Sequence, residues 1–202
     1  MTMSISAVIL AGGQAKRMEG ADKGLQLLHG KPLFQFIYER LHSQVETISI
    51  NANRNQTIYA TAGVPVFGDN LEGFQGPLSG ILTALERADS DFVLFVPCDS
   101  PFFPDNLLEK LKSAVDFHGV SIAYVHDGER EHPTFCLMAR SLKEKLAAYL
   151  ASGERRMLQF MRQNGAVSVD FSENKQAFTN INTLADLTYF NQQKDFPGFI
   201  AK

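Results

Sequence analysis

The sequence has few cysteines, and their placement excludes several kinds of site. Cys98 and Cys136 lie far apart in the 202-residue chain, each within an apolar run and neither beside a histidine cluster. This spacing argues against a zinc site and offers no disulfide framework. We therefore expect both thiols to be small buried side chains.

Long apolar runs and an excess of charge are also missing. No stretch reaches the ~18–20 apolar residues that a membrane-spanning helix needs. The first residues, MTMSIS, lack a basic segment followed by a long apolar one, so we expect no secretion signal and a cytoplasmic location. The formal net charge is only -3, which predicts neither a nucleic-acid partner nor a membrane surface. Any basic site must therefore be local.

Two common phosphate-binding signatures are absent as well. There is no G-x-G-x-x-G sequence, and the nearest approach to a Walker A motif, residues 24–32, has five spacer residues instead of four. That segment also places Pro32 where a serine or threonine would bind magnesium. The sequence is therefore not that of a P-loop nucleoside triphosphatase nor, by this fingerprint, of a dinucleotide-binding dehydrogenase.

The chain does contain a regular alternation of short apolar runs with amphipathic stretches. Strands are expected at 5–11, 46–53, 64–69 and 91–99. Helices are expected at 33–44, 55–63, 77–88 and 104–115. This alternation predicts βαβ units, in which a mostly parallel central sheet lies between helices in a three-layer α/β/α, Rossmann-like arrangement.

The pattern changes after about residue 117. Segments 119–127 and 133–140 predict an antiparallel pair of strands about a charged turn, DGEREH. They are followed by two helical segments, a strand at 166–171 and a last helix from about Thr183. No linker or internal repeat interrupts the chain, so we expect a single domain over residues 1–202.

Polar residues follow each of the first four expected strands. In an open parallel sheet, ligands bind outside the carboxyl ends of the strands. Those positions hold Gly12, Gly13 and Lys23 after the first strand, and then Asn51, Asp69 and Asp99 after the next three. Glycines, a cation, an amide and carboxylates at one edge predict a site for a polyphosphate and a metal ion.

The loop after the first strand combines glycine with cations. Glycine lets backbone N–H groups approach an anion closely because no Cβ blocks the contact. Lys16, Arg17 and Lys23 can then neutralise phosphate charge. An ordinary solvated basic loop is the competing interpretation.

Asp99 closes an apolar strand and precedes two prolines that fix the following turn. A carboxylate on a rigid strand end suits Mg²⁺, which takes one or two carboxylates together with nucleotide phosphates. A turn-forming or helix-capping aspartate is the competing local explanation. For Asp69, a solvated strand-end side chain is equally compatible with the sequence.

Together these segments resemble one known family. Residues 10–24, LAGGQAKRMEGADKG, are similar to the L-A-G-G-x-x-x-R-M-G-x-x-K loop of sugar-nucleotide-type nucleotidyltransferases, except that Glu19 follows Met18 and the glycine comes one place later. The G-x-D-K-G ending is typical of the molybdenum cofactor guanylyltransferase branch. Further segments resemble that branch in the expected order: INANR (50–54), GPLSGI (76–81), PCDSPF (97–102), VHDGEREHPT (125–134), GERRMLQFMR (153–162) and FTNINTLADL (178–187).

The resemblance implies a nucleotidyltransferase fold, with a nucleotide-binding part at about 1–117 and an acceptor-binding part at about 118–202. The implied reaction transfers GMP from GTP to the terminal phosphate of molybdopterin that already carries molybdenum, and releases pyrophosphate. Molybdopterin-handling proteins and molybdoenzyme chaperones are the further partners it implies. The implied catalytic residues are Arg17, Lys23 and Asp99, with Asp99 holding Mg²⁺. The implied nucleotide-binding residues are Leu10, Ala11, Gly12, Gly13, Lys23, Asn51, Asp69 and Asp99.

The resemblance also implies a set of residues for the pterin substrate, namely His132, Arg155, Arg156, Asn180 and Asn182. Asn180 and Asn182 alternate along an extended run, so both should project from one face, although Asn182 could instead cap a helix. The two arginines precede a helix, and the helix dipole disfavours cations at that end. A nearby phosphate would offset this unfavourable placement of positive charge. His132 could equally be structural.

Two alternatives remain open from the sequence. The first is a related nucleotidyltransferase that uses CTP or a different phosphate acceptor, because motif spacing does not choose a base. The second is a molybdopterin carrier without turnover. A carrier need not assemble a cage of metal and cations, so Arg17, Lys23 and Asp99 together favour an enzyme.

Overall fold

The computed structural model describes residues 3–13, 22–73 and 76–193. The strands are β1 (Ile5–Leu10), β2 (Leu27–Leu28), β3 (Lys31–Pro32), β4 (Ile48–Asn51), β5 (Val66–Phe67), β6 (Phe92–Pro97), β7 (Ile122–His126), β8 (Glu131–Ala139) and β9 (Val167–Asp170). The α-helices are α1 (Leu33–His42), α2 (Gln56–Tyr59), α3 (Pro77–Arg87), α4 (Leu107–His118), α5 (Lys143–Ala151), α6 (Met157–Gln163) and α7 (Leu184–Gln192). The 3₁₀ helices are η1 (Lys23–Leu25), η2 (Ala60–Ala62), η3 (Arg140–Leu142) and η4 (Ser172–Phe178).

Seven of these strands form one central sheet in the order β5-β4-β1-β6-β8-β7-β9. β1 pairs in parallel with both β4 and β6, and β7 pairs in parallel with β9. β8 runs antiparallel to both of its neighbours, β6 and β7. The sequence prediction of a mostly parallel sheet with an antiparallel element in the C-terminal half is therefore confirmed.

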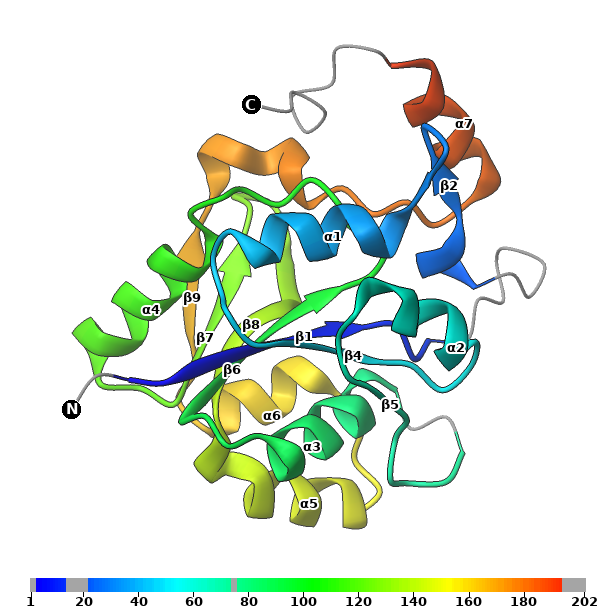
Figure 1. Cartoon of the computed structure of the whole chain (residues 1–202). Helices are drawn as coiled ribbons and strands as arrows, with labels where there is room; N and C mark the ends of the chain where they lie inside the picture. Colours follow the sequence, from blue (N-terminus) through cyan, green and yellow to red (C-terminus); the bar gives the residue numbers. More distant parts are fainter. Residues whose placement is uncertain (1–2, 14–21, 74–75, 194–202) are drawn as a thin grey trace.

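Helices cover both faces of the sheet, which gives the expected three layers (Figure 1). On one face, α1 and α4 pack with their apolar stripes against the sheet, and Leu41 and Leu111 are both fully buried there. On the other face, α3, α5 and α6 do the same through residues such as Ile81 and Phe160. Each fully buried side chain of this kind stabilises the fold by about 1.5–3 kcal/mol.

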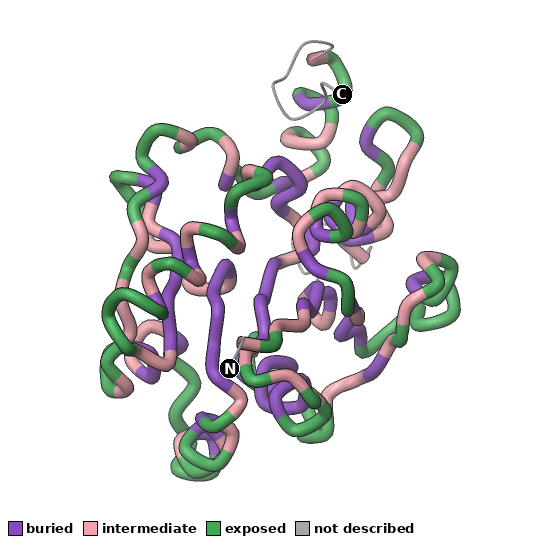
Figure 2. Tube along the Cα trace, turned by 60° about the vertical axis from the view of Figure 1, so that its left-hand side comes forward, coloured by how far each residue is buried: buried purple, intermediate pink, exposed green. Residues whose placement is uncertain are grey.

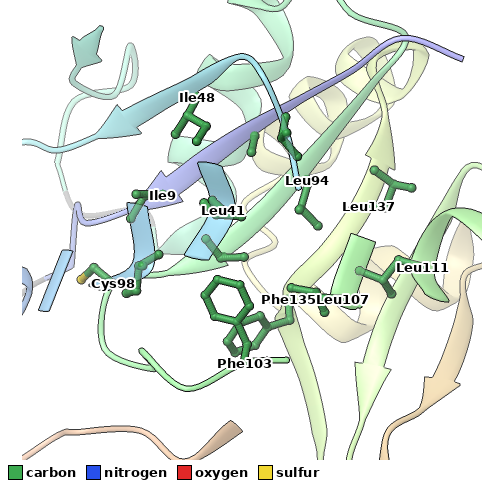
Figure 3. Packing of buried hydrophobic residues seen from close by; sticks show 14 of the residues in the cluster. Ile9, Leu41, Ile48, Leu94, Cys98, Phe103, Leu107, Leu111, Phe135 and Leu137 are labelled. Atoms are coloured by element: carbon green, nitrogen blue, oxygen red, sulfur yellow. The ribbon is translucent and has the colours of Figure 1, made fainter. Parts of the chain in front are cut away.

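The parallel strands carry apolar residues on both faces because both faces are covered. Val93, Leu94, Phe95 and Val96 of β6 are all 0% exposed. Figure 3 shows the hydrophobic core on one face of the sheet, in which side chains from β1, β4, β6 and β8 meet those of α1 and α4. In Figure 2 the buried segments run through the interior, and exposed residues occupy the loops and outward helix faces.

Local signals explain several element boundaries. α3 begins at Pro77, whose missing N–H costs nothing at a first helical position. The expected helix at 55–63 is divided into α2 and η2 and ends at Gly63, which has a φ of 76°. α4 begins at Leu107 rather than at Pro104, because residues 104–106 form a turn that precedes the helix.

A short hairpin of β2 and β3 was not expected from the sequence. It packs against α7 through a small apolar cluster of Leu28, Leu33, Phe102, Ile181 and Phe190. Asn191 of α7 fixes this contact, since its Oδ1 accepts from the His29 N–H at 2.7 Å. α7 is therefore fixed beside the β2–β3 hairpin, although the two are far apart in the sequence.

No helix within the described ranges is both long enough and apolar enough to cross a membrane.

Candidate active site

The polar residues predicted at strand ends meet at one edge of the sheet. β1, β4, β5 and β6 are parallel, so their carboxyl ends lie together. β8 runs the other way, and its first residues therefore lie at this same edge, beside the end of β6. β7 and β9 run in the same direction as β6, so the segment after β9 also begins at this edge. β8 ends at the opposite edge and α5 starts from there, so the loop between α5 and α6 returns to this edge (Figure 1).

Two adjoining cavities open at this edge. The larger, about 370 Å³, is lined by Leu10, Gly12, Gly13, Asn51, Asp69, Gly76, Pro77, Gly80, Pro97 and Thr134. The smaller, about 120 Å³, is lined by Leu10, Ala11, Gly13, Asp22, Lys23, Pro97, Cys98 and Asp99. Three residues, Leu10, Gly13 and Pro97, are common to both, so the cavities share a wall. The first has mainly small and apolar walls apart from Asn51, Asp69 and Thr134, whereas the second is lined by Asp22, Lys23 and Asp99.

Asn51 and Asp69 are joined in the larger cavity. Asn51 is 2% exposed, and its Nδ2 donates to Asp69 Oδ1 at 2.8 Å. A Cβ on Gly80 would lie 2.2 Å from Asn51 Oδ1, so only glycine in α3 leaves room for this amide. Gly12 packs against the same oxygen from the other side, at 3.2 Å from its would-be Cβ. The sequence thus holds a polar amide–carboxylate pair in one orientation beside an apolar cavity.

Lys23 and Asp99 form an ion pair in the smaller cavity. The Lys23 Nζ lies 3.2 Å from Asp99 Oδ2, and the two side chains are 25% and 14% exposed. The same ammonium donates to Asn182 Oδ1 at 2.5 Å. A cation and a carboxylate thus stand together next to Gly13, at the end of two central strands.

The segment after η4 crosses back over the end of β6. The Ser100 hydroxyl donates to Asn180 Oδ1 at 2.6 Å, and the Ile181 N–H donates to the backbone oxygen of Asp99 at 2.7 Å. Asn180 therefore contacts the turn that begins with Asp99, whereas Asn182 contacts Lys23, which pairs with Asp99. The cap of α7 is Thr183, which accepts from the Asp186 N–H at 3.0 Å, so the side chain of Asn182 is left for Lys23.

His132 lies at the start of β8 and is held on two sides. Its Nε2 is 2.6 Å from Asp127 Oδ2, and its ring lies against Phe178 with centroids 5.5 Å apart. Burial by itself would raise the pKa of Asp127, but the hydrogen bond from His132 and two backbone N–H bonds outweigh it and lower the pKa to about 2. This pair fixes the β7–β8 turn, which supports the structural explanation that the sequence left open for His132.

Arg155 and Arg156 lie in the exposed connection between α5 and α6. The Arg155 guanidinium donates to the backbone oxygens of Leu150 and Glu154 at 2.7 and 2.6 Å. Arg156 precedes the first residue of α6, and its backbone oxygen accepts from the Tyr149 hydroxyl at 2.9 Å. Neither arginine lines the two cavities, so the structure does not bring them into contact with Lys23 and Asp99 within its described part.

Two further predictions concern the basic residues of the first loop and the cysteines. Lys16 and Arg17 lie outside the described residues. Cys98 and Cys136 are buried as expected, and burial, together with the adjacent Asp99 carboxylate in the case of Cys98, raises the pKa of these thiols. Among the residues that do line the site, sequence reasoning missed Asp22 and Thr134, and it missed Ser100 beside them. Asp22 sits inside the recognised G-x-D-K-G sequence, which was the signal that could have identified it.

Comparison with known proteins points to one family. Residues 7–167 match the family model described as the MobA-like NTP transferase domain. The chain is 70% identical over 187 residues to the molybdenum cofactor guanylyltransferase of Mannheimia succiniciproducens, covering 93% of this chain and 98% of the relative. It is 64% identical to the Haemophilus influenzae guanylyltransferase, with 93% and 97% covered. Identity to that of Yersinia pestis is 44%, with 96% and 98% covered.

Solved structures share the fold at lower identity. Molybdopterin-guanine dinucleotide biosynthesis protein A from Archaeoglobus fulgidus superposes with a TM-score of 0.76 at 21% identity, covering 92% of this chain and 96% of that one. A 4-diphosphocytidyl-2C-methyl-D-erythritol synthase from Anaerococcus prevotii gives 0.73 at 14% identity, with 94% and 95% covered. These likenesses confirm the nucleotidyltransferase fold alone.

Proposed function

Since this chain belongs to the family of molybdenum cofactor guanylyltransferases, we propose that it transfers GMP from GTP to the terminal phosphate of molybdenum-loaded molybdopterin. The products are the guanine dinucleotide form of the cofactor and pyrophosphate. The observation that carries the proposal is the pairing of Lys23 with Asp99 at 3.2 Å beside the glycine-lined end of β1. A carrier would have no need for this arrangement of charge.

The nucleotide is proposed to lie across both cavities. Its base and sugar occupy the larger cavity, where small residues such as Gly12 and Gly80 allow close approach and the Asn51–Asp69 pair offers polar contacts. Its phosphates lie toward Gly13 and Lys23, since backbone N–H groups and an ammonium suit an anion. Leu10 belongs to the wall that the two cavities share, and Ala11 lines the smaller cavity beside it.

The residues present fit a single Mg²⁺ bound together with nucleotide phosphates. Asp99 supplies one carboxylate on a rigid strand end, which is what such a magnesium site requires. Within the described residues there is no cluster of three or more histidine, cysteine or acidic side chains that would bind a metal by itself. When bound, the ion would neutralise charge on the phosphates.

The chemistry needs no general base, because the attacking group is a phosphate oxygen that is already anionic at neutral pH. That oxygen attacks the α-phosphorus of GTP, the bond between the α-phosphorus and the bridging oxygen breaks, and pyrophosphate leaves. The protein's task is to bring two polyanions together and to stabilise charge on the transferred and leaving phosphates. Lys23 and the backbone amides at Gly12 and Gly13 would stabilise this charge. We propose the same role for Arg17 because it lies between Gly13 and Lys23 in the sequence.

The acceptor is proposed to approach from the C-terminal part of the chain. Asn180 contacts Ser100 and Asn182 contacts Lys23, so this segment lies next to the proposed phosphate site. Arg155 and Arg156 lie at the same edge of the sheet and are exposed, which suits long-range attraction of an anionic pterin. His132 is bonded to Asp127, so in this proposal it shapes the region and does not donate to the substrate.

The first test is thermal stabilisation of the purified protein by GTP, CTP, ATP and UTP, each with and without Mg²⁺. A ligand that binds only the native state at ~100 times its Kd adds roughly 2.7 kcal/mol, which raises Tm by about 5–10 °C for a chain of this size. We expect the largest shift with GTP and Mg²⁺. An equal or larger shift with CTP would instead assign the protein to cytidylyl transfer.

A further inference from the structure

Asp22, which is partly buried, and Tyr59, which is fully buried, form a hydrogen-bonded pair that the proposed mechanism does not use. Tyr59 lies in α2 and is 0% exposed, and its ring meets that of Phe34 edge-on with centroids 4.9 Å apart. The Tyr59 hydroxyl donates to Asp22 Oδ1 at 2.5 Å. Burial and the neighbouring anionic groups raise the pKa of Tyr59, so its hydroxyl remains a donor. The contact joins α2, which follows β4, to the segment that follows the first loop.

The Asp22 carboxylate is held by two further donors. Asn55 Nδ2 donates to Asp22 Oδ2 at 3.1 Å, and the Gly24 N–H donates to Asp22 Oδ1 at 3.3 Å. The backbone oxygen of Asp22 accepts from the Leu25 N–H at 3.2 Å and from Gln26 Nε2 at 3.1 Å. Residues 22–26 therefore wrap around Asp22, and the tyrosine fixes that wrapped segment to the core.

The fit between this segment and Tyr59 is close. Gly24 is buried, and a Cβ built on it would lie 2.5 Å from the Tyr59 hydroxyl oxygen and 3.1 Å from the ring. Any side chain at position 24 would therefore displace the tyrosine or the segment. Lys23 lies between these two fixed residues, and its side chain leaves the segment toward Asp99 and Asn182.

We propose that Tyr59 is a positioning residue for the reaction, which acts through Asp22 to fix the backbone of Lys23 so that the ammonium stands beside Asp99. The inference rests on the proposed function, because it assumes that Lys23 contacts the nucleotide phosphates. A lysine side chain has four flexible carbons, so a fixed backbone reduces the number of places its ammonium can occupy. Misplacement of a catalytic group by about 1 Å can cost ~100-fold in rate.

The test is the substitution Tyr59→Phe, measured alone and in a Lys23→Ala background. The change removes one hydroxyl and keeps the ring against Phe34. Titration calorimetry gives the Kd for GTP with Mg²⁺, and steady-state assays give kcat. If Tyr59 acts through Lys23, we expect Tyr59→Phe to weaken GTP binding or lower kcat about tenfold in the wild-type chain and less than twofold in the Lys23→Ala background.

Tyr124→Phe is the matched control. Tyr124 is also buried, at 4% exposed, and its hydroxyl also donates to a carboxylate, that of Glu131 at 2.6 Å, but on a different part of the sheet. It should lose stability as Tyr59→Phe does while keeping the Kd for GTP and kcat. If Tyr59→Phe does not fold, Asp22→Asn, which keeps the size of the side chain, tests the same link.

The outcomes separate the two proposals. Equal losses from Tyr59→Phe in both backgrounds, or equal losses from Tyr59→Phe and Tyr124→Phe, would overturn the positioning role while leaving guanylyl transfer intact. Failure of the unsubstituted protein to bind GTP would overturn the proposed function and this inference with it. A loss that is confined to chains that retain Lys23 supports the inference.

Discussion

Asp99 combines a rigid backbone with a charged environment. It lies two residues after the end of β6, a central strand of the sheet, and its backbone oxygen accepts from the Ile181 N–H at 2.7 Å, so its backbone is held by two parts of the chain. The Lys23 Nζ lies 3.2 Å from Asp99 Oδ2. A carboxylate held in place at a phosphate site is what the proposed magnesium role requires.

We therefore predict that Asp99→Asn lowers Mg²⁺-dependent guanylyl transfer at least 100-fold, because a metal held at the phosphates contributes several kcal/mol of charge stabilisation. The fold should survive, since asparagine has nearly the same size and Asp99 is at the edge of the core. Steady-state rates and Tm check the two parts separately.

Asp105→Asn is the control for this change. Asp105 lies on the same connection between β6 and α4, and its side chain is 68% exposed. Its Oδ1 is 3.2 Å from Arg40 Nη1, and neither residue lines the two cavities. Its loss should leave turnover unchanged and stability within about 1 kcal/mol. Near-normal transfer by Asp99→Asn would remove Asp99 from the magnesium site.

The turn between β7 and β8 contains a second fixed carboxylate with a different role. The Glu129 and Arg130 N–H groups donate to Asp127 Oδ1 at 2.8 and 2.7 Å, and His132 holds the other oxygen. Gly128 completes the turn at a φ of 93°, where a Cβ would also lie 2.9 Å from Ser172. The turn thus depends on the ionised form of Asp127.

This dependence predicts how stability varies with pH. The pKa of Asp127 is lowered to about 2 in the folded protein, so the unfolded state binds its proton more tightly. The stabilisation is therefore fully present above about pH 5 and is lost as the pH falls toward 2, with about half gone near pH 3. Asp127→Asn should destabilise by about 1–2 kcal/mol at pH 7, and this difference from the wild type should shrink as the pH falls.

Urea unfolding at pH 7, 4 and 3 measures the effect. Asp116→Asn on α4 serves as the comparison, because Asp116 is 54% exposed and lies 3.7 Å from Lys112. That variant should stay within about 0.5 kcal/mol of the wild type at every pH. A constant deficit for Asp127→Asn from pH 7 to 3 would contradict the assigned cause.

Most helices and strands could be predicted from the sequence because their signals are local. Short sequence signals mark several boundaries to within a few residues: the apolar run of β6, Pro77 at the start of α3 and Gly63 after η2. The β2–β3 hairpin could not be predicted in this way. Its strands are two residues long, and it is held by packing against α7, which lies about 160 positions later in the chain.

In the site, too, some features have local sequence signals and others depend on long-range contacts. Lys23, Asn51, Asp69 and Asp99 could be predicted, since a strand followed by a polar residue is visible in the sequence and the sheet brings the strand ends together. The contact of Lys23 with Asn182 spans 159 positions and leaves no local trace. The pairing of Asp22 with Tyr59 is hidden for the same reason, and it also depends on a missing Cβ at Gly24.

Across the whole molecule, the chain returns to the site after it has completed the sheet. Figure 1 shows the segment that leads from η4 to α7. Within it, Asn180 accepts from the Ser100 hydroxyl and Asn182 accepts from the Lys23 ammonium. The proposed nucleotide part and acceptor part therefore meet where the charged groups are. This arrangement suits the proposed reaction, which joins two anionic substrates at a shared phosphate site.

The most direct test of this account is the fate of labelled phosphate in a reaction with molybdenum-loaded molybdopterin, Mg²⁺ and GTP. With the label on the α-phosphate, we predict that it appears in the pterin product, one GMP for each pyrophosphate released. With the label on the γ-phosphate, it should appear only in pyrophosphate. Label from the γ-phosphate in the pterin product, or transfer from CTP in preference to GTP, would contradict the account.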